Sequence, residues 1–418
     1  MVHKTFSVDG SSRVQCRSCG ESGLNSILSL GSTPLANALL TEDRLGQAES
    51  TWPLDLAWCS HCSLVQITEA VPPELMFRDY AYFSSFSDTM VQHAKCIADR
   101  LAEKESLDDR SLVVEVASND GYLLQWYQKV GVPVLGIEPA RNIAKVAEAE
   151  KGIRTISEFF GRELATQLVA AGEQADVIHA NNVLAHVPDL NGVVAGFKIL
   201  LKPGGVVVVE APYLGELIEH TEFDTIYHEH LCYFSLTALN LLFQRHDLTI
   251  VDVERLPIHG GSVRIFARHS GTCAVGENVL NMLAEESQWV FSLPHYKKFE
   301  QRVEKLRSDL VSLLQQLKSK DQRIAVYGAS AKGSTLLNYF GIGAETLEYV
   351  VDRSTVKQGR YTPGTQLKIH DPEMLLKDRP DYCLLLTWNF VDEILAQQKD
   401  YRDQGGKFII PIPQLRVA

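Results

Sequence analysis

The chain has 418 residues, of which 45% are hydrophobic and 22% charged, and its formal net charge is −12. This length fits two or three domains, and the composition excludes a disordered or fibrous protein. The acidic balance, with no tract dense in lysine or arginine, disfavours a nucleic-acid partner or an anionic membrane. Residues 1–7 lack the apolar core of a signal peptide and no long apolar run follows, so we expect a cytoplasmic protein.

Four of the eight cysteines form two CxxC knuckles, Cys16 with Cys19 and Cys59 with Cys62. Two knuckles supply the four thiolates of a closed, structural zinc site, which we place in an N-terminal module over residues 1–75. His61 could replace one thiolate, and a redox pair or unrelated cysteines are the alternatives. The other cysteines are expected to be buried thiols: Cys96, Cys232, Cys273 and Cys383.

Short apolar runs alternate with helical patterns in the next part of the chain. We expect strands at 111–116, 134–138, 176–180 and 206–210, with helices at 88–104, through Leu123 to Trp126, and around 144–149. Such alternation predicts an open parallel sheet covered by helices on both faces. We assign this second domain to residues 76–255.

A long helix and a second α/β sheet are expected in the remaining part, residues 256–418. One apolar stripe should pack the helix at 295–320 on the body of the protein or on a second subunit: Phe299, Val303, Leu306, Leu310, Leu313 and Leu317. Strands are expected at 323–327, 347–352 and 382–387. The turn at 328–333 lies between a strand and a helix, where backbone N–H groups attract anions.

The turn after the first strand of the second domain, residues 115–121, stands where nucleotide-type ligands bind in such sheets. Only Gly121 remains of a three-glycine pattern, which disfavours a dinucleotide and its pyrophosphate. With Glu138 after the next strand and Asn181 after a later one, the order resembles the class I S-adenosylmethionine-dependent methyltransferases. The resemblance implies these cofactor-binding residues: Glu115, Ala117, Ser118, Asn119, Gly121, Glu138, Asn142, Asn181 and Asn182.

The segment 227–233 gathers two histidines, a glutamate and two tyrosines beside the expected methyl donor. His228 and His230 could alternatively share one face of a strand and bind a metal. Together with the segments 80–85, 259–264 and 357–364, the chain resembles sugar C-methyltransferases that act on nucleotide-linked 4-keto-deoxyhexoses. Ala117 departs from that family, in which glycine is common at this position.

That resemblance implies His230 as the general base. Glu229 and Tyr227 would orient its imidazole and the sugar, and His186 or a tyrosine would donate a hydrogen bond to the enolate oxygen. A histidine with an ordinary pKa near 6.5 suits proton abstraction at neutral pH. Lys332 and the turn at 328–333 are expected to hold a diphosphate, although packing explains Trp388 and Asn389 equally well. The expected substrate-binding residues are Tyr80, Tyr82, His186, Ser330, Lys332, Trp388 and Asn389.

The expected fold is therefore a central class I methyltransferase (Rossmann-like) sheet, with an N-terminal zinc-binding module and a C-terminal Rossmann-like α/β domain. The expected activity is methyl transfer from S-adenosylmethionine to a carbon alpha to the ketone, C3, of a sugar linked to dTDP or another nucleoside diphosphate. Deoxysugar biosynthesis is the setting, and the enzyme is a monomer or homodimer. The alternatives are a sugar-nucleotide epimerase or nicotinamide-dependent oxidoreductase, and a non-catalytic zinc-knuckle binding protein with a degenerate methyltransferase fold.

Overall fold

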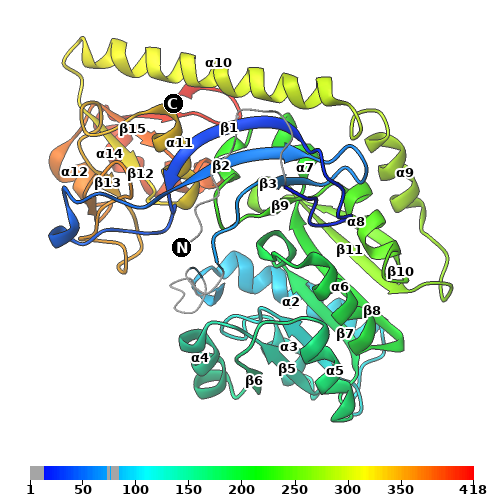
Figure 1. Cartoon of the computed structure of the whole chain (residues 1–418). Coiled ribbons are helices and arrows are strands. Elements are labelled where there is room, and N and C mark those ends of the chain that lie inside the picture. The colour runs from blue at the N-terminus through cyan, green and yellow to red at the C-terminus, as the bar shows by residue number, and fades with distance from the viewer. Residues whose placement is uncertain (1–13, 73–75, 77–83) are drawn as a thin grey trace.

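The computed structural model describes residues 14–72, 76 and 84–418. Within this part of the chain, the strands form three sheets that follow one another from the N-terminus to the C-terminus (Figure 1). Two of them are flanked by helices, as the alternation of apolar runs predicts.

The first sheet is antiparallel and belongs mostly to the N-terminal part of the chain. Its strand order is β1 (Asn25–Pro34), β2 (Thr51–Trp58), β3 (Val65–Ile67) and β9 (Cys232–Tyr233). The last strand comes from the middle of the chain and pairs with β3 through Val65 opposite Tyr233 and Gln66 opposite Cys232. The N-terminal module is therefore joined to the second domain by backbone hydrogen bonds.

The second sheet has seven strands, and all of them are parallel except β11. Its order is β10 (Leu248–Leu256), β11 (Ser262–His269), β8 (Leu201–Pro212), β7 (Ala175–Asn181), β4 (Val113–Val116), β5 (Val134–Ile137) and β6 (Thr155–Ile156). The strand order reverses between β4 and β7, so the edge where both strands end is the expected ligand site.

Helices cover both faces of this sheet, and the first of them has the bounds predicted from the sequence. They are α2 (Asp88–Lys104), α3 (Leu124–Lys129), α4 (Arg141–Lys151), α5 (Arg162–Ala170), α6 (Leu190–Leu200), α7 (Leu214–Glu219) and α8 (Leu236–Gln244). The boundary expected at residue 255 falls inside β10, which pairs with β11. We propose to place it after β11.

The third sheet lies in the C-terminal domain. Its order is β14 (Ile369–His370), β13 (Val350–Val351), β12 (Ile324–Tyr327), β15 (Tyr382–Leu385), β16 (Lys407–Ile410) and the antiparallel β17 (Arg416–Val417). The strand expected at 347–352 is thus shorter than predicted. The helices are α11 (Ala331–Phe340), α12 (Met374–Asp378), α13 (Val391–Gln397) and α14 (Lys399–Asp403).

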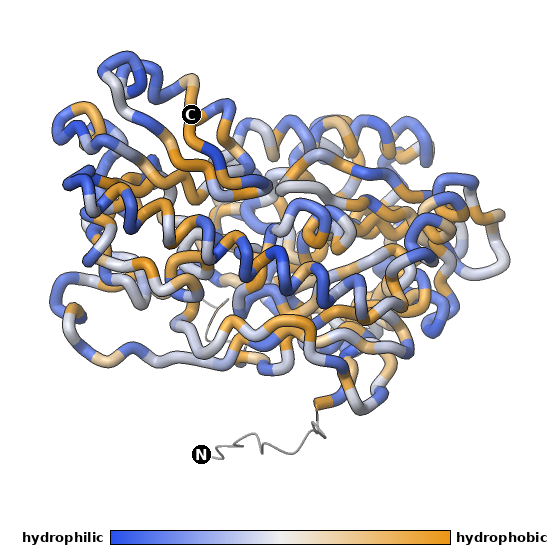
Figure 2. The backbone as a smooth tube through the Cα atoms, turned by 90° about the horizontal axis from the view of Figure 1, so that it is seen from above, coloured by the Kyte–Doolittle hydropathy of each residue, from blue (hydrophilic) through white to orange (hydrophobic). Residues whose placement is uncertain are grey.

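Two helices, α9 (Glu277–Glu286) and α10 (Leu293–Lys318), connect the second sheet to the third (Figure 1). Hydrophobic and hydrophilic positions alternate along α10, which lies near the viewer in Figure 2. The predicted stripe is correct except at one position: Leu314 is buried and Leu313 is only partly buried. The buried face packs on the protein's own core, as the contact between Trp58 and Tyr296 rings at 5.3 Å shows.

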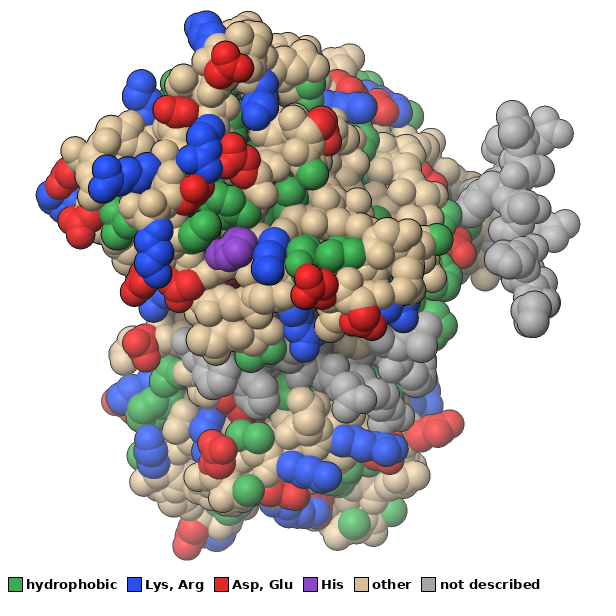
Figure 3. Space-filling model, turned by 90° about the vertical axis from the view of Figure 1, so that its left-hand side faces the viewer, with side chains coloured by type: hydrophobic (Ala, Val, Ile, Leu, Met, Phe, Trp, Pro, Cys, Tyr) green, Lys and Arg blue, Asp and Glu red, His purple; other side chains and the backbone are tan. Residues whose placement is uncertain are grey.

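Positive and negative side chains are interspersed on the face drawn in Figure 3, with no patch of one sign. No helix in the described ranges has both the length and the apolar character that crossing a membrane requires.

Candidate active site and zinc centre

The four knuckle cysteines converge at the beginning of the N-terminal module. Their sulfur atoms all lie within 4.8 Å of one another, with Cys16 Sγ at 3.4 Å from Cys62 Sγ and Cys19 Sγ at 3.6 Å from Cys59 Sγ. Tetrahedral zinc with bonds of about 2.3 Å separates its sulfur ligands by about 3.8 Å, so the cluster fits this ion. His61 is exposed and does not belong to the cluster. The four thiols form a closed site without a position for substrate.

The other cysteines match the prediction only in part. Cys232 and Cys383 are buried, whereas Cys96 and Cys273 are exposed. The expectation failed for these two because Cys96 lies on the exposed side of α2 and Cys273 lies in a turn after β11.

The turn after β4 has an unusual backbone conformation that makes a cradle. Ala117, Asn119 and Gly121 have φ values of 52°, 49° and 75°. A side chain at Gly121 would also come within 2.4 Å of the Ile153 Cδ1 atom, so glycine is required there. Ala117 is also in the left-handed region, where the Cβ atom of a residue other than glycine causes strain. This is the position at which glycine is common in the family that the sequence resembles.

Glu138 fixes the shape of this turn from the end of β5. Its carboxylate accepts hydrogen bonds from the Asn119 backbone N–H at 2.9 Å and the Ala140 N–H at 2.8 Å. Burial raises the pKa of Glu138, while these two bonds act in the opposite direction. The residue therefore lies where an acid can also accept hydrogen bonds from ribose hydroxyls.

Two buried oxygen atoms near the turn after β4 could accept hydrogen bonds from a ligand. Neither Glu115 Oε2 nor Asn181 Oδ1 has a hydrogen-bond partner among the described residues, although both atoms are buried. Burial, and then the carboxylates of Asp120 and Glu138, raise the pKa of Glu115. S-adenosylmethionine carries amine and ribose hydroxyl donors, so the residues fit this cofactor. Asn182 has a φ of 57° and Asn142 is half-buried near the start of α4.

We expect Glu138→Ala to weaken S-adenosylmethionine binding at least tenfold, because the turn loses two backbone bonds and the ribose loses its acceptor. Titration calorimetry of the wild type and the variant measures this. Glu148→Ala, on the exposed side of α4, is the matched control and should bind normally. Equal affinity in all three proteins would contradict this role for Glu138.

His230 is held by its own neighbourhood in residues 225–230, which we call the His230 segment. Its Nδ1 lies 2.9 Å from the Thr225 carbonyl oxygen, so Nδ1 carries the proton and donates it. Its Nε2 lies 2.9 Å from the Tyr227 hydroxyl, which donates to it. The segment thus presents an unprotonated nitrogen with a tyrosine beside it.

The other residues of this segment point in different directions. His228 Nε2 lies 3.2 Å from the carbonyl oxygens of Trp52 and Pro53 in β2, so it is a buried structural residue. The alternative of a metal held by both histidines on one strand face is wrong, since the segment is a turn and His230 bonds elsewhere. Glu229 accepts a hydrogen bond from Asn37 Nδ2 at 2.6 Å.

His186 lies beside His230, with their ring centres 4.9 Å apart. Its Nδ1 donates to the Glu229 carbonyl oxygen at 2.7 Å. Burial lowers the pKa of His186 to about 4, so at neutral pH this N–H is its only one. Its other nitrogen is an acceptor, which favours a tyrosine over His186 as the donor to an enolate oxygen.

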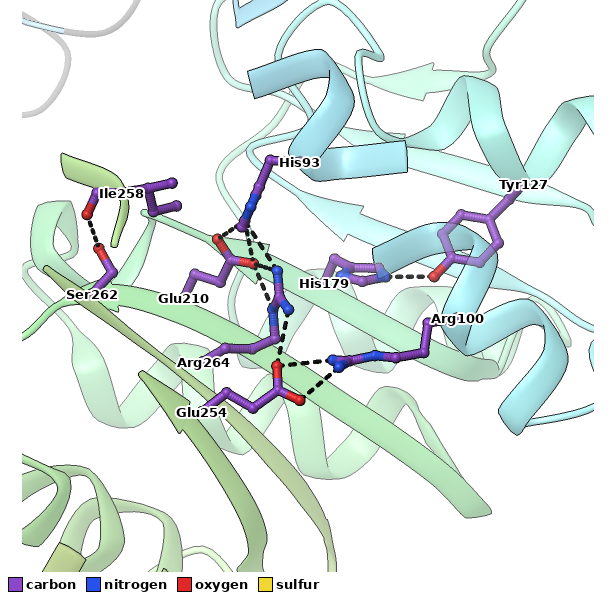
Figure 4. A network of polar contacts seen from close by, with 9 residues as sticks. All are labelled: His93, Arg100, Tyr127, His179, Glu210, Glu254, Ile258, Ser262 and Arg264. Carbon is purple, nitrogen blue, oxygen red and sulfur yellow. Dashed lines mark hydrogen bonds and ion pairs between the residues drawn. The ribbon is translucent and has the colours of Figure 1, made fainter. Parts of the chain in front are cut away.

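A charged network that the sequence did not reveal anchors α2 to the second sheet (Figure 4). Arg264 Nε donates to Glu210 Oε1 at 2.7 Å, and His93 Nε2 lies 3.0 Å from Glu210 Oε2. Glu254 joins Arg264 to Arg100 at 3.0 and 2.7 Å. These residues come from α2, β8, β10 and β11, and only Arg264 stood in a motif we singled out. The network fixes α2 directly after the segment that contains Tyr80 and Tyr82, two residues outside the described ranges.

We call the turn after β4, whose residues fit the methyl donor S-adenosylmethionine, the donor turn. In the C-terminal domain, the turn after β12 resembles it in its bonding. Asp352, at the end of β13, accepts from the Ala329 N–H at 2.8 Å with one oxygen and from the Ser354 N–H at 2.8 Å with the other. Glu138 makes the same two kinds of bond in the second domain. Ser330 caps α11 by accepting from the Gly333 N–H at 3.0 Å. Both α/β sheets therefore end in a turn fixed by an acid.

Lys332 and Trp388 lie together, with Nζ 4.2 Å from the ring centroid. The ammonium group is buried, and burial lowers the pKa of Lys332, while the nearby Asp224 and Glu222 act in the opposite direction. Asp224 accepts from Trp388 Nε1 at 2.7 Å. Asn389 follows and is half-buried.

Two carboxyl groups of this cluster make stability depend on pH. Burial raises the pKa of Glu222 to about 8 and that of Asp224 to about 6, although Lys332 acts in the opposite direction. Between pH 5 and 8 the folded protein then holds more protons than the unfolded chain, so the free energy of unfolding falls as pH rises. We expect a loss on the order of 2–4 kcal/mol between pH 5.5 and 8.5 in urea unfolding. Glu222→Gln should flatten this dependence, and an unchanged slope would contradict it.

The strand order of the second sheet, with its donor turn at the switch point, defines a class I methyltransferase. Three family models match the chain in order: a putative zinc binding domain at 16–77, a methyltransferase domain at 91–253 and a C-methyltransferase C-terminal domain at 257–413. The C-methyltransferase NovU of Streptomyces niveus is 38% identical over 405 residues, which are 96% of each chain. The chain therefore belongs to the S-adenosylmethionine-dependent C-methyltransferases with a zinc-binding N-terminal domain.

Other relatives match only the methyltransferase part. The ubiquinone biosynthesis O-methyltransferase of Leptothrix cholodnii is 35% identical over 99 residues, 23% of this chain and 41% of that protein. Among solved structures, the magnesium protoporphyrin IX methyltransferase of Synechocystis with bound SAM aligns with a TM-score of 0.34 and 12% identity. That alignment covers 43% of this chain and 79% of the other.

Proposed function

We propose that this enzyme transfers a methyl group from S-adenosylmethionine to C3, a carbon alpha to the ketone, of a nucleotide-linked 4-keto-6-deoxyhexose. The site belongs to a cytoplasmic enzyme of deoxysugar biosynthesis. Its support is the geometry of the His230 segment together with membership of the C-methyltransferase family. The acceptor is a small molecule with an acidic C–H bond, because carbon is methylated most readily as an enolate.

The tautomer of His230 is the observation that carries this proposal. A backbone carbonyl holds the proton on Nδ1, so Nε2 is the atom that can accept a proton from the sugar. The Tyr227 hydroxyl occupies Nε2 in the free enzyme and keeps the ring oriented until the sugar C–H group approaches. Glu229, from the same turn, orients the sugar.

The cofactor supplies an electrophilic methyl group on a sulfonium. The chain's own residues generate and direct the nucleophile: His230 Nε2 takes the proton, and the electron pair of the C–H bond becomes the enolate. The Tyr227 hydroxyl then donates to the enolate oxygen, because the neutral His186 has committed its N–H to Glu229. His186 contacts the sugar as an acceptor.

The sugar nucleotide is proposed to extend from this site to the C-terminal domain. We propose that the N-terminus of α11, with Ser330, Lys332, Trp388 and Asn389, binds the diphosphate. Asp352 bonds its turn as Glu138 does, which supports a contact with a ribose. Tyr80 and Tyr82 are proposed to contact the donor or sugar. The first described residue after this segment is Ser84, whose N–H donates to Asn119 Oδ1, in the turn after β4, at 2.9 Å.

The test is incubation of the enzyme with S-adenosylmethionine and a panel of dTDP- and UDP-linked 4-keto-6-deoxyhexoses, in water and in deuterated water. A product heavier by one CH2, with NMR placing the methyl group at C3, is the expected result. Methylation at another carbon would correct the position, and methylation on oxygen would overturn the enolate mechanism. Deuterium uptake without methyl transfer would indicate an epimerase.

A further inference from the structure

The N-terminal module holds the His230 segment from outside the methyltransferase sheet. The strand that follows the segment, β9, extends the N-terminal sheet, and the carbonyls of Trp52 and Pro53 in β2 hold His228. The Ile67 N–H also donates to the Leu231 carbonyl at 3.0 Å. The backbone around the base is therefore shaped by residues of the zinc-binding module.

One side chain of this module reaches the segment itself. Asn37, in the turn after β1, donates from Nδ2 to Glu229 Oε1 at 2.6 Å. Glu229 is only 8% exposed, and a buried carboxylate needs donors to offset its lost hydration. Asn37 itself is exposed, so it lies where solvent or a ligand can reach it.

The same turn contacts the C-terminal domain. The Leu40 N–H donates to the Tyr361 carbonyl at 2.9 Å, and the Tyr361 N–H donates back to the Leu40 carbonyl at 2.9 Å. Residues 35–40 thus connect the Glu229 carboxylate with the domain proposed to bind the sugar nucleotide. The turn at residues 35–40 therefore contacts both other domains, the second through Asn37 and the C-terminal one through Leu40.

We propose that Asn37 is a positioning residue of the sugar site, contributed by the zinc-binding module. Its amide fixes the Glu229 carboxylate, and the pair receives a polar substituent of the sugar ring, a hydroxyl or amine, beside the carbon to be deprotonated. This inference rests on the proposed function. It gives the module a role in catalysis that a purely stabilising metal domain does not have.

The kinetic test compares Asn37→Ala and Asn37→Asp with the wild type. Because Asn37 is exposed, both variants should fold, and their unfolding midpoint should fall only slightly as the buried Glu229 carboxylate loses one donor. We expect kcat/KM for the sugar to fall about 100-fold in Asn37→Ala, because the reacting groups lose their alignment. Asn37→Asp should fall further, since a second carboxylate faces Glu229. Asn37→Gln, which keeps the donor, should recover part of the activity, and S-adenosylmethionine affinity should change in none of them.

Asn191→Ala is the matched control. Asn191 also joins the module to the methyltransferase domain, through Nδ2 to the Arg17 and Ser18 carbonyls at 3.0 and 3.1 Å. Its Oδ1 accepts from His246 Nε2 at 2.9 Å, and none of these partners belongs to the His230 segment. It should keep its sugar kinetics. If Asn37→Ala and Asn191→Ala behave alike, Asn37 is only an interdomain contact and the inference is overturned.

A second readout does not depend on turnover. In spectra of 15N-histidine-labelled protein, Asn37→Ala should shift the ring signals of His186, which bonds the Glu229 carbonyl, and of His230. Asn191→Ala should leave both signals in place. If the wild type methylates no sugar, the proposed function fails, while the histidine signals still decide whether Asn37 positions the segment. Unshifted signals in Asn37→Ala would overturn the inference.

Discussion

Replacing His230 with asparagine should lower kcat by about 10²- to 10⁴-fold, because the sugar C–H proton loses its acceptor. Asparagine keeps a donor that can face the Thr225 carbonyl, so the local fold should survive. The affinity for S-adenosylmethionine should remain that of the wild type, because the donor turn lies in a different part of the sheet. Single-turnover methyl transfer and calorimetry measure the two effects separately.

His228→Asn, two residues before His230, is the control for this variant. His228→Asn removes a ring bonded to the Trp52 and Pro53 carbonyls, so it should lower the free energy of unfolding by about 1–3 kcal/mol. The folded fraction should retain most of its kcat, since this ring faces β2. If His228→Asn abolished turnover in folded protein while His230→Asn did not, the two roles would have to be exchanged.

The two α/β sheets were predictable because their strands are short, unbroken apolar runs followed by turns, whereas the antiparallel sheet that joins β3 to β9 was not predicted. The run before Ala117 and the run before Asn181 led directly to β4 and β7, and their turns to the donor site. Strand ends were less predictable. Residues 347–352 have the composition of a long strand, but the strand itself is only Val350–Val351, between β12 and β14.

Around His230, the sequence was informative only where residues are close along the chain. The cluster at 227–233 was visible as a run of ionisable residues, yet the run did not show that His228 and His230 point apart. That difference depends on β2, more than 170 residues away. Asn37 and Glu210 were missed for the same reason: each acquires its partner, Glu229 or Arg264, through the fold alone.

Removing the zinc ligand Cys62 should have the largest effect on the protein's stability. Structural zinc sites contribute about 10–16 kcal/mol of binding energy, which is available only to the folded module. Cys62→Ser should therefore lose its bound zinc, lower the unfolding midpoint and reduce methyl transfer. Metal analysis by mass spectrometry, thermal unfolding and activity assays on the same preparation measure the three effects. Wild-type protein should carry one zinc ion per chain.

The reason that activity should fall with the metal lies in how the sheets are joined. Loss of the ion loosens β3, and β3 is the neighbour of β9, the strand that follows His230. S-adenosylmethionine binding should persist, because Glu138 and the turn after β4 belong to the second sheet. Cys96→Ser, at an exposed cysteine outside the cluster, is the matched control and should keep metal, midpoint and activity. A Cys62→Ser protein without zinc but with full activity would show that the metal centre and the His230 segment are independent.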